Sequence, residues 1–359
     1  MKLDRRDIEL LRLAVMYRHL PVDLFEALGF DSVADEVRLL TAAGIVKTSR
    51  DKKYIRPAPQ TYELLQKYGY SCGSIQTDKP YSKASSLHRR LETSSIMLTA
   101  LRAGISTLPA DVDALAQQPM FYPSFEFRGS ESNLMNAANC AAFGNWGNVG
   151  YMLQFISANS FGMYLTNELR HLHNLSSIFS STLKTPLAMI FAGISYTNIY
   201  VQLHSTQHSP RHGKNGFHDF WDVYQKTEMP IHLLSCDETG ATQLALMRQT
   251  DHKPRIAKAA LGKDWTAQNN QIPEADGCVG ATPLIIAADM DVRRVLKVCD
   301  KARNLGQQEV MLAALESQVE EFYPRVLPHD GLVTFLSIDQ ALIDEAFGGD
   351  FSLYAMEED

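Results

Sequence analysis

The order of the predicted elements in the first 70 residues constrains the fold more than any other feature of this chain. Apolar residues recur at helical spacing in three short segments, which begin after Asp4, after Pro21 and near Val33. Gly29 and Gly44 follow the second and third segments, and glycine after the last helical residue is a typical stop signal. Two β-like runs around a polar turn come next, and a further helical pattern follows them. Three short helices followed by a hairpin and another helix predict a winged helix-turn-helix.

The transition from the third helix into the hairpin supports this prediction. Residues 40–46 are LTAAGIV, which resembles the L-x-x-x-G-(I/L)-(I/V) junction of winged helices. Residues 45–48 and 53–56 are β-like, and the turn between them, SRDK, is polar. The helical pattern that follows covers residues 61–68, as the order of elements in a winged helix requires.

The charge of the chain is unevenly distributed. The whole sequence of 359 residues has a formal net charge of −7, which on its own argues against a polyanionic partner. Residues 1–90 contain 16 basic and 11 acidic side chains, a net charge of +5, whereas the remainder contains 18 basic and 30 acidic side chains, a net charge of −12. If the chain binds nucleic acid, the contact is therefore expected in its N-terminal part.

Basic and short polar side chains occur where a winged helix contacts double-stranded DNA. In such domains the third helix enters the major groove, and basic residues on the hairpin hold phosphates. The candidate DNA-binding residues are Ser32, Arg38 and Thr41 on the third helix, Lys47, Arg50, Lys52, Lys53 and Arg56 on the hairpin, and Arg89 and Arg90 at the start of a later helix. Asp31, Asp35 and Glu36 on the third helix would repel phosphate. The alternative is a winged helix that contacts protein or forms a dimer.

The remainder of the chain alternates between apolar runs and helical patterns. Residues 69–86 indicate a polar linker, and a helix over 86–103 is expected to bridge to a second domain. Strands are predicted at 120–127, 150–157, 229–235, 282–288 and 332–337, and a further apolar run covers 187–191. Helices are predicted at 162–181, 238–247 and 339–347, and another helix ends at 302. This alternation favours an α/β domain with a mixed sheet, and an α+β class overall. The predicted units are the winged helix (1–70), a linker with the bridging helix (71–107) and the α/β domain (108–359).

No segment indicates a membrane span, a secretion signal or a zinc-binding cysteine pattern. No run of 18 uncharged apolar residues occurs, charges interrupt the N-terminal segment, and the five cysteines are scattered without a C-x-x-C pair. We expect a cytoplasmic protein with no membrane partner, no cofactor, no metal site and no catalytic residue.

Three further patterns have ordinary structural explanations. Residues 144–150 (GNWGNVG) lack the helix start and the Gly-Lys-Ser/Thr sequence of a phosphate-binding loop, so a simple loop is expected. Histidines crowd a polar segment beside Asp219 and Asp222, and an exposed loop is expected there rather than a metal site. These histidines are His204, His208, His212 and His218. Acidic residues that follow predicted strands are interpreted as helix caps, and they are Asp237, Glu238, Asp289 and Asp291.

Taken together, these patterns resemble the replication-relaxation family of plasmid and conjugative-element proteins, which includes relatives of the MobC-type relaxases. That family pairs a winged helix with a domain like the PD-(D/E)XK nucleases. The resemblance implies a strand with a Pro-Asp pair, a strand with E-x-D or E-x-K, a helix, and then a strand, a helix and a final strand. Residues 122–127 and 151–157 match the first two strands, and the helix from 162 and the segments 282–302 and 332–337 match the later elements.

Two positions depart from the nuclease pattern. Ser124 stands where the Pro-Asp pair has its aspartate, and Gln154 stands where the next strand has an acid, with no lysine after it. Metal-assisted cleavage of a phosphodiester needs clustered carboxylates to hold Mg²⁺. The resemblance therefore implies a nuclease-like domain that has lost its catalytic metal site.

Three functions are compatible with these observations. The first is a sequence-specific double-stranded DNA-binding protein of a plasmid, phage or integrative element, which acts in replication, conjugative transfer or transcriptional control without cleaving DNA. Its partners would be DNA, a protein of a replication or transfer complex, and a second copy of the chain in a homodimer. The second is a metal-dependent nuclease or relaxase that uses Asp219, Asp222, Glu228 or Asp237 with nearby histidines. The third is an adaptor whose winged helix binds protein.

Overall fold

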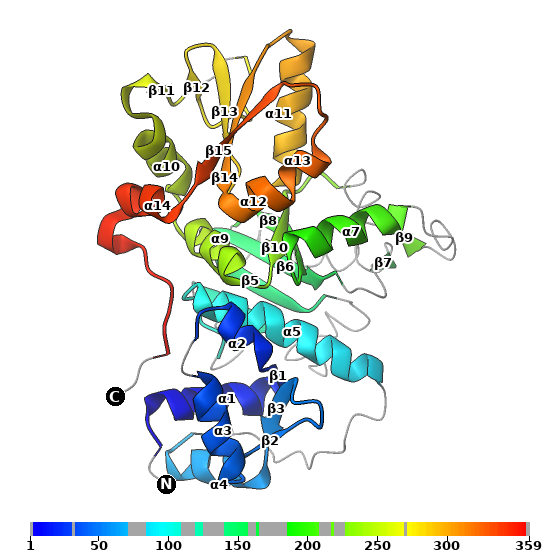
Figure 1. Ribbon diagram of the computed structural model, residues 1–359, viewed down its shortest axis with the longest axis vertical. Coiled ribbons are helices and arrows are strands. Elements are labelled where there is room, and N and C mark those ends of the chain that lie inside the picture. Colours follow the sequence, from blue (N-terminus) through cyan, green and yellow to red (C-terminus); the bar gives the residue numbers. More distant parts are fainter. Residues whose placement is uncertain are drawn as a thin grey trace.

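The computed structural model describes residues 3–30, 33–70, 84–108, 119–124, 140–156, 163–164, 185–207, 217–218, 227–268 and 271–356. The fold class is mixed α/β, as the sequence predicts. Figure 1 shows the N-terminal helices at the bottom, one long helix across the middle, and two β-sheets above it. Within the described ranges, the search for a helix with the length and apolarity of a membrane span found none.

The first 70 residues contain the predicted helices and hairpin. The helices are α1 (Arg5–Tyr17), α2 (Asp23–Ala27), α3 (Val33–Ala42) and α4 (Pro59–Lys67), and the strands are β1 (Leu20–Pro21), β2 (Val46–Thr48) and β3 (Tyr54–Pro57). The three strands pair antiparallel in the order β1-β3-β2. The Asp4 carboxylate starts α1 by accepting a hydrogen bond from the backbone N–H of Asp7 at 2.8 Å. The order of elements confirms the predicted helix-turn-helix and hairpin, while the predicted cap of α3, Asp31 or Ser32, lies outside the described residues.

The helix α5 (Ala84–Arg102) connects the winged helix to the first sheet (Figure 1). It contacts α1, α2 and β1 on one side and β4, β6 and α9 on the other. One hydrophobic core therefore runs from the winged helix through α5 into the sheet. The Tyr17 hydroxyl donates to the Thr107 carbonyl at 2.8 Å, and the Tyr354 hydroxyl donates to the Glu9 carboxylate at 2.7 Å. The segment after α5 and the segment near the C-terminus thus fix the winged helix against the rest of the protein.

The first sheet has five strands in the order β10-β8-β6-β5-β4. They are β4 (Met120–Pro123), β5 (Ala142–Trp146), β6 (Val149–Phe155), β8 (Leu187–Gly193) and β10 (Ile231–Ser235). β4, β5 and β6 form an antiparallel meander, and β6, β8 and β10 pair parallel. Helices α5 and α9 (Glu238–Arg248) cover one face, and α7 (Tyr196–Gln207) covers the other. Because both faces are buried, β8 and β10 are apolar along most of their length.

The second sheet has five strands in the order β11-β12-β13-β14-β15. They are β11 (Trp265–Thr266), β12 (Cys278–Val279), β13 (Thr282–Ile286), β14 (Val310–Leu315) and β15 (Val333–Ile338). The last three strands are parallel and are linked through α11 (Val292–Asn304), α12 (Glu316–Glu321) and α13 (Tyr323–Val326). Helices α10 (His252–Leu261) and α14 (Gln340–Phe347) pack on one face, and α11 to α13 pack on the other. Two short 3-10 helices, η5 (Gly262–Asp264) and η6 (Gly348–Asp350), follow α10 and α14. A separate pair of antiparallel strands, β7 (Met163–Tyr164) and β9 (Phe217–His218), lies beyond α7.

Buried polar side chains join the two sheets. Three backbone carbonyls just after β13 each accept a hydrogen bond from a side chain on a neighbouring helix. The donors and acceptors are Gln243 with Asp289 at 3.1 Å, Gln318 with Ala288 at 3.1 Å, and Tyr323 with Ala287 at 3.0 Å. Because these buried carbonyls have partners, the end of β13 can lie against β10 without the cost of unsatisfied polar groups.

Three local predictions differ from the structure. Residues 144–150, expected as a loop, form the end of β5, a turn and the start of β6. Gly147 and Asn148 have φ values of 56° and 60°, as a two-residue turn between twisted antiparallel strands requires. His204 lies on α7 rather than in an exposed loop. Residues 163–164, expected at the start of a helix, form β7, and most of that predicted helix lies outside the described residues.

Candidate nucleic-acid interface

The wing, defined here as residues 46–57 with strands β2 and β3, has five basic side chains. Lys47, Arg50, Lys52 and Lys53 are exposed, and Arg56 is half-buried. Lys47 and Arg56 are opposite each other in the antiparallel register, so both side chains lie on the same face of the hairpin. Asp51 is the one acid among these residues, which leaves the wing with a net charge of +4. The structure thus brings the predicted hairpin residues together on one exposed element.

The turn of the wing holds a lysine in a left-handed backbone conformation. Lys52 has a φ of 57°, which costs a residue other than glycine about 1 kcal/mol or more. The Lys52 N–H donates to the Ser49 carbonyl at 3.0 Å, and the Ser49 N–H donates to the Tyr54 carbonyl at 2.9 Å. Asp51 accepts from the Ser49 hydroxyl at 2.6 Å, and this hydrogen bond lowers the pKa of the carboxyl. Glycine or asparagine would relieve the backbone strain, so a lysine here lowers stability and keeps a positive charge at the tip.

Helix α3 presents a nearly neutral surface beside the wing. The Thr41 hydroxyl lies 3.0 Å from the Thr48 hydroxyl, which connects α3 to β2. Arg38 and Asp35 form an ion pair, and both side chains are largely exposed. Because Arg38 balances Asp35, this part of the helix neither attracts nor repels phosphate strongly. The predicted groove residue Ser32 lies outside the described residues.

Glu36, which the sequence analysis expected to repel phosphate, points into the domain. It is buried and accepts a hydrogen bond from Arg6 of α1 at 3.2 Å. Asp7 of α1 is buried beside it. Burial raises the pKa of Asp7 to about 7, and the neighbouring Glu36 carboxyl contributes to the same shift. The expected repulsion from Glu36 was therefore wrong, because this acid holds α1 and α3 together instead of facing DNA.

The first half of α5 adds basic side chains next to β3. Arg89 and Arg90 are half-buried on α5. Burial lowers the pKa of His19 to about 4, and the nearby charges of Arg90, Arg56 and Arg18 lower it further. His19 is therefore neutral at physiological pH, with arginines from α5, β3 and the end of α1 around it. This arrangement extends the basic surface from the wing onto the helix that leads to the sheets.

Ser124 and Gln154 lie at the same end of the first sheet, directly after β4 and in β6, the two strands that flank β5. The Ser124 N–H donates to the Ala141 carbonyl at 2.9 Å, and the Ala141 N–H donates to the Leu153 carbonyl at 2.8 Å. Ser124 and Gln154 are buried, with 4% and 5% of their surfaces exposed. The two positions that the resemblance assigns to acids both hold neutral side chains.

Two of the acids of the alternative nuclease hypothesis, Glu228 and Asp237, lie within the described residues, and neither belongs to a metal-binding cluster there. Asp237 accepts a hydrogen bond from the Gly240 N–H at 2.9 Å and caps α9, as predicted, and burial raises the pKa of its carboxyl. Glu228 is exposed, and His218 lies in β9. Asp219, Asp222, His208 and His212 lie outside the described residues. Within the part of the chain that the structure describes, no group of three or more His, Cys, Asp or Glu side chains is arranged to hold a metal ion.

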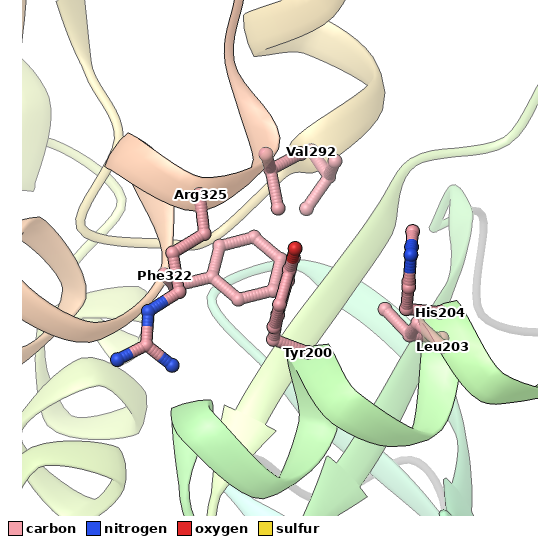
Figure 2. A pocket seen from close by; sticks show the side chains of 7 residues that line it. Tyr200, Leu203, His204, Val292, Phe322 and Arg325 are labelled. Carbon is pink, nitrogen blue, oxygen red and sulfur yellow. The ribbon is translucent and has the colours of Figure 1, made fainter.

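A cavity of about 220 Å³ lies where α7, α11 and α13 meet. Its lining is mostly apolar, and it consists of Tyr200, Leu203, His204, Val292, Phe322, Arg325 and Val326. Figure 2 shows Tyr200 beside Phe322, with the guanidinium of Arg325 directed away from His204. The His204 ring stacks on Tyr200 with a centroid distance of 5.9 Å. His204 therefore packs against an aromatic side chain here, and the cavity has few polar groups that would orient a ligand.

Sequence reasoning missed a buried charge cluster between the sheets. Asp289 is 4% exposed and pairs with Lys253 at 2.6 Å and with Arg294 at 3.5 Å. Although burial alone would raise it, the pKa of Asp289 is held well below its usual value by these two cations. A cavity of about 320 Å³ beside the cluster is lined in part by His232 and His252. Asp289 was expected as a helix cap, but Asp291 caps α11, and no local pattern links Asp289 to a lysine 36 positions earlier.

Comparisons of the chain with protein-family models, with curated proteins and with solved structures found no match.

Proposed function

We propose that this chain is a sequence-specific, double-stranded DNA-binding protein that holds phosphates with its wing and does not cleave DNA. The observation that carries the proposal is the wing, an exposed hairpin with a net charge of +4. Duplex DNA has one negative charge per about 1.7 Å of its axis, so a small cationic hairpin gains binding free energy by releasing counterions. The strained Lys52 supports the same proposal, because it keeps a charge at the tip of the wing at the expense of stability.

The geometry beside the wing supports a helix in the major groove. An α-helix with its side chains is about 10–12 Å wide, and the major groove is about 12 Å wide. α3 is joined to β2 through Thr41 and Thr48, and the inward direction of Glu36 removes one acid from its outer surface. In the proposed complex α3 occupies the groove, the wing contacts one phosphate backbone, and Arg90 of α5 lies next to the phosphates that adjoin β3.

The α/β part supports a role without cleavage. The first sheet contains β4 and β6, the two strands that the resemblance matches, with the unpredicted β5 between them, while β13 and β15 of the later matched segments belong to the second sheet. Ser124 and Gln154 lack the charge to hold a catalytic cation. We propose that this part is a scaffold that positions the winged helix and docks a protein of a replication or transfer complex of a plasmid, phage or integrative element.

The test is the salt dependence of DNA binding by the full-length protein and a wing variant. Lys52→Asn combined with Lys53→Asn removes two charges, and asparagine tolerates the left-handed conformation at residue 52. Each lost phosphate contact should weaken binding to a 30-bp duplex about eightfold at 0.1 M salt and lower the slope of log K against log[salt] by about 0.9. The matched control is Lys258→Asn with Lys263→Asn, which removes two exposed charges on α10 and η5, at the far end of the molecule in Figure 1.

The wing contact would be refuted if the wing variant and the control bound every duplex with equal affinity and equal salt slopes. Nicking of supercoiled plasmid in Mg²⁺ that is lost in Asp237→Ala would favour the nuclease hypothesis instead. A protein that ignores DNA at low salt but forms a stable complex with another protein through the winged helix would favour the adaptor hypothesis.

A further inference from the structure

An exposed leucine occupies the middle of the outer face of α3. Leu39 is 60% exposed, whereas Val33, Val37 and Leu40 on the same helix are buried. Leu39 belongs to the apolar residues of this helical segment, but the core does not include it. A single exposed leucine is common on protein surfaces, but this one lies on the helix that the proposed function places in the major groove.

The side chains around Leu39 leave mainly methyl groups available on this face. Ala34 and Ala42 are exposed. Each is four positions from Arg38, so the three residues form one stripe along the helix. The guanidinium of Arg38 is engaged by the Asp35 carboxylate. Small alanine side chains permit close approach of another surface, and the large apolar group on the face is the isobutyl group of Leu39.

Base edges in the major groove offer one apolar group, the C5-methyl group of thymine. We propose that α3 reads thymine methyl groups through Leu39, with Ala42 in the same contact. This inference rests on the proposed DNA-binding function and assigns its base preference. The wing favours DNA over an apolar protein surface as the partner of this face. Its net charge of +4 begins at Lys47, eight residues after Leu39, and the contact between Thr41 and Thr48 joins α3 to the wing. An apolar protein partner would have to desolvate this charge without compensation.

The experiment selects bound sequences and then removes individual methyl groups. The wild-type protein is used to enrich duplexes from a library with a random 20-bp core, and the enriched duplex is resynthesised with deoxyuridine in place of each thymidine in turn. We expect at least one position where the loss of a single methyl group weakens binding about fourfold, which equals about 0.8 kcal/mol. In Leu39→Ala this fourfold difference should disappear at that position, and Leu39→Gln should shift the preference there from thymine toward adenine.

The control is Leu305→Ala, which makes the same change at a leucine that is 51% exposed after α11. In this control, each replacement of thymidine by deoxyuridine should change the binding affinity as much as it does in the wild type. The inference is overturned if the enriched duplexes contain no recurrent thymine, if no deoxyuridine changes the affinity, or if Leu39→Ala keeps all the wild-type effects. Absence of binding to any duplex would instead overturn the proposed function itself. If Leu39→Ala leaves DNA binding intact but dissociates a dimer in sedimentation, the face is a protein interface and the inference is also wrong.

Discussion

Replacing Asp7 with asparagine should make the stability of the protein less dependent on pH. Asp7 and Glu36 are two buried carboxyls, with Arg6 as the cation that donates to Glu36 at 3.2 Å. The pKa of Asp7 is about 7 in the folded state, chiefly because of burial, against 3.8 for an unperturbed aspartate. The folded protein therefore keeps a proton between pH 3.8 and 7 that the unfolded chain releases. Stability must fall as pH rises through this window.

The size of the effect follows from the shift. Each pH unit well inside the window lowers the free energy of unfolding by about 1 kcal/mol, so the rise from pH 5 to pH 7 costs about 2 kcal/mol, and little more is lost above pH 7. In Asp7→Asn the amide oxygen can still accept from the Asp4 N–H, as Asp7 does at 3.2 Å, and its N–H can donate to Glu36. The variant keeps the capping box and supplies a donor at every pH.

The assay is urea unfolding of the full-length protein, followed by far-UV circular dichroism at pH 5 and at pH 8. The free energy of unfolding of Asp7→Asn relative to the wild type should be about 2–3 kcal/mol larger at pH 8 than at pH 5. Asp23→Asn, at an exposed position in α2, controls for the loss of one negative charge. An equal loss of stability in Asp7→Asn at both pH values would show that Asp7 is ionised when folded and would refute this reasoning.

Two further substitutions test other parts of the fold, and the wing and Leu39 variants above complete the set. A Cβ atom at Gly240 would overlap the Ser235 carbonyl oxygen, so Gly240→Ala should lower the free energy of unfolding by about 3 kcal/mol, whereas Gly349→Ala, which meets no atom, should leave it unchanged. Burial lowers the pKa of His19 to about 4, so on acidification the unfolded chain takes up a proton before the folded protein does, and the wild type loses stability. The free energy of unfolding of His19→Phe relative to the wild type should therefore rise by about 2 kcal/mol as the pH falls from 7.5 to 5. Urea unfolding measures both effects. A wild-type free energy of unfolding in Gly240→Ala, or a pH-independent stability difference between His19→Phe and the wild type, would contradict these predictions.

The predictions from sequence succeeded where local signals determine the element. Asp4 and Gly29 delimit short helices, and the polar turn between two β-like runs becomes the wing, because caps, stops and turns depend on residues only a few positions apart. β5 was missed, since its glycines indicate a loop and its pairing partners lie on two other strands. The buried contacts of Asp289 and the inward direction of Glu36 depend on tertiary packing, which periodicity does not encode.

The same distinction applies to the candidate interface. A single sequence identified the basic residues of the wing, because charge is a property of each residue. It did not identify which acids of α3 face solvent, because Asp35 and Glu36 are adjacent in sequence, and yet Asp35 is exposed and Glu36 is buried. Nor did it show that Leu39 is exposed, since four apolar residues on a ten-residue helix do not all fit one buried stripe.

The acidic remainder of the chain limits where DNA can run in the proposed complex. Residues 91–359 have a net charge of −12, and α5 separates the winged helix from the first sheet by about the width of one helix, roughly 10 Å. The Debye length at 0.1 M salt is also about 10 Å, so a duplex that bends from the wing toward the sheets meets repulsion that salt screens only in part. In the proposed complex, DNA is therefore expected on the wing side of the molecule.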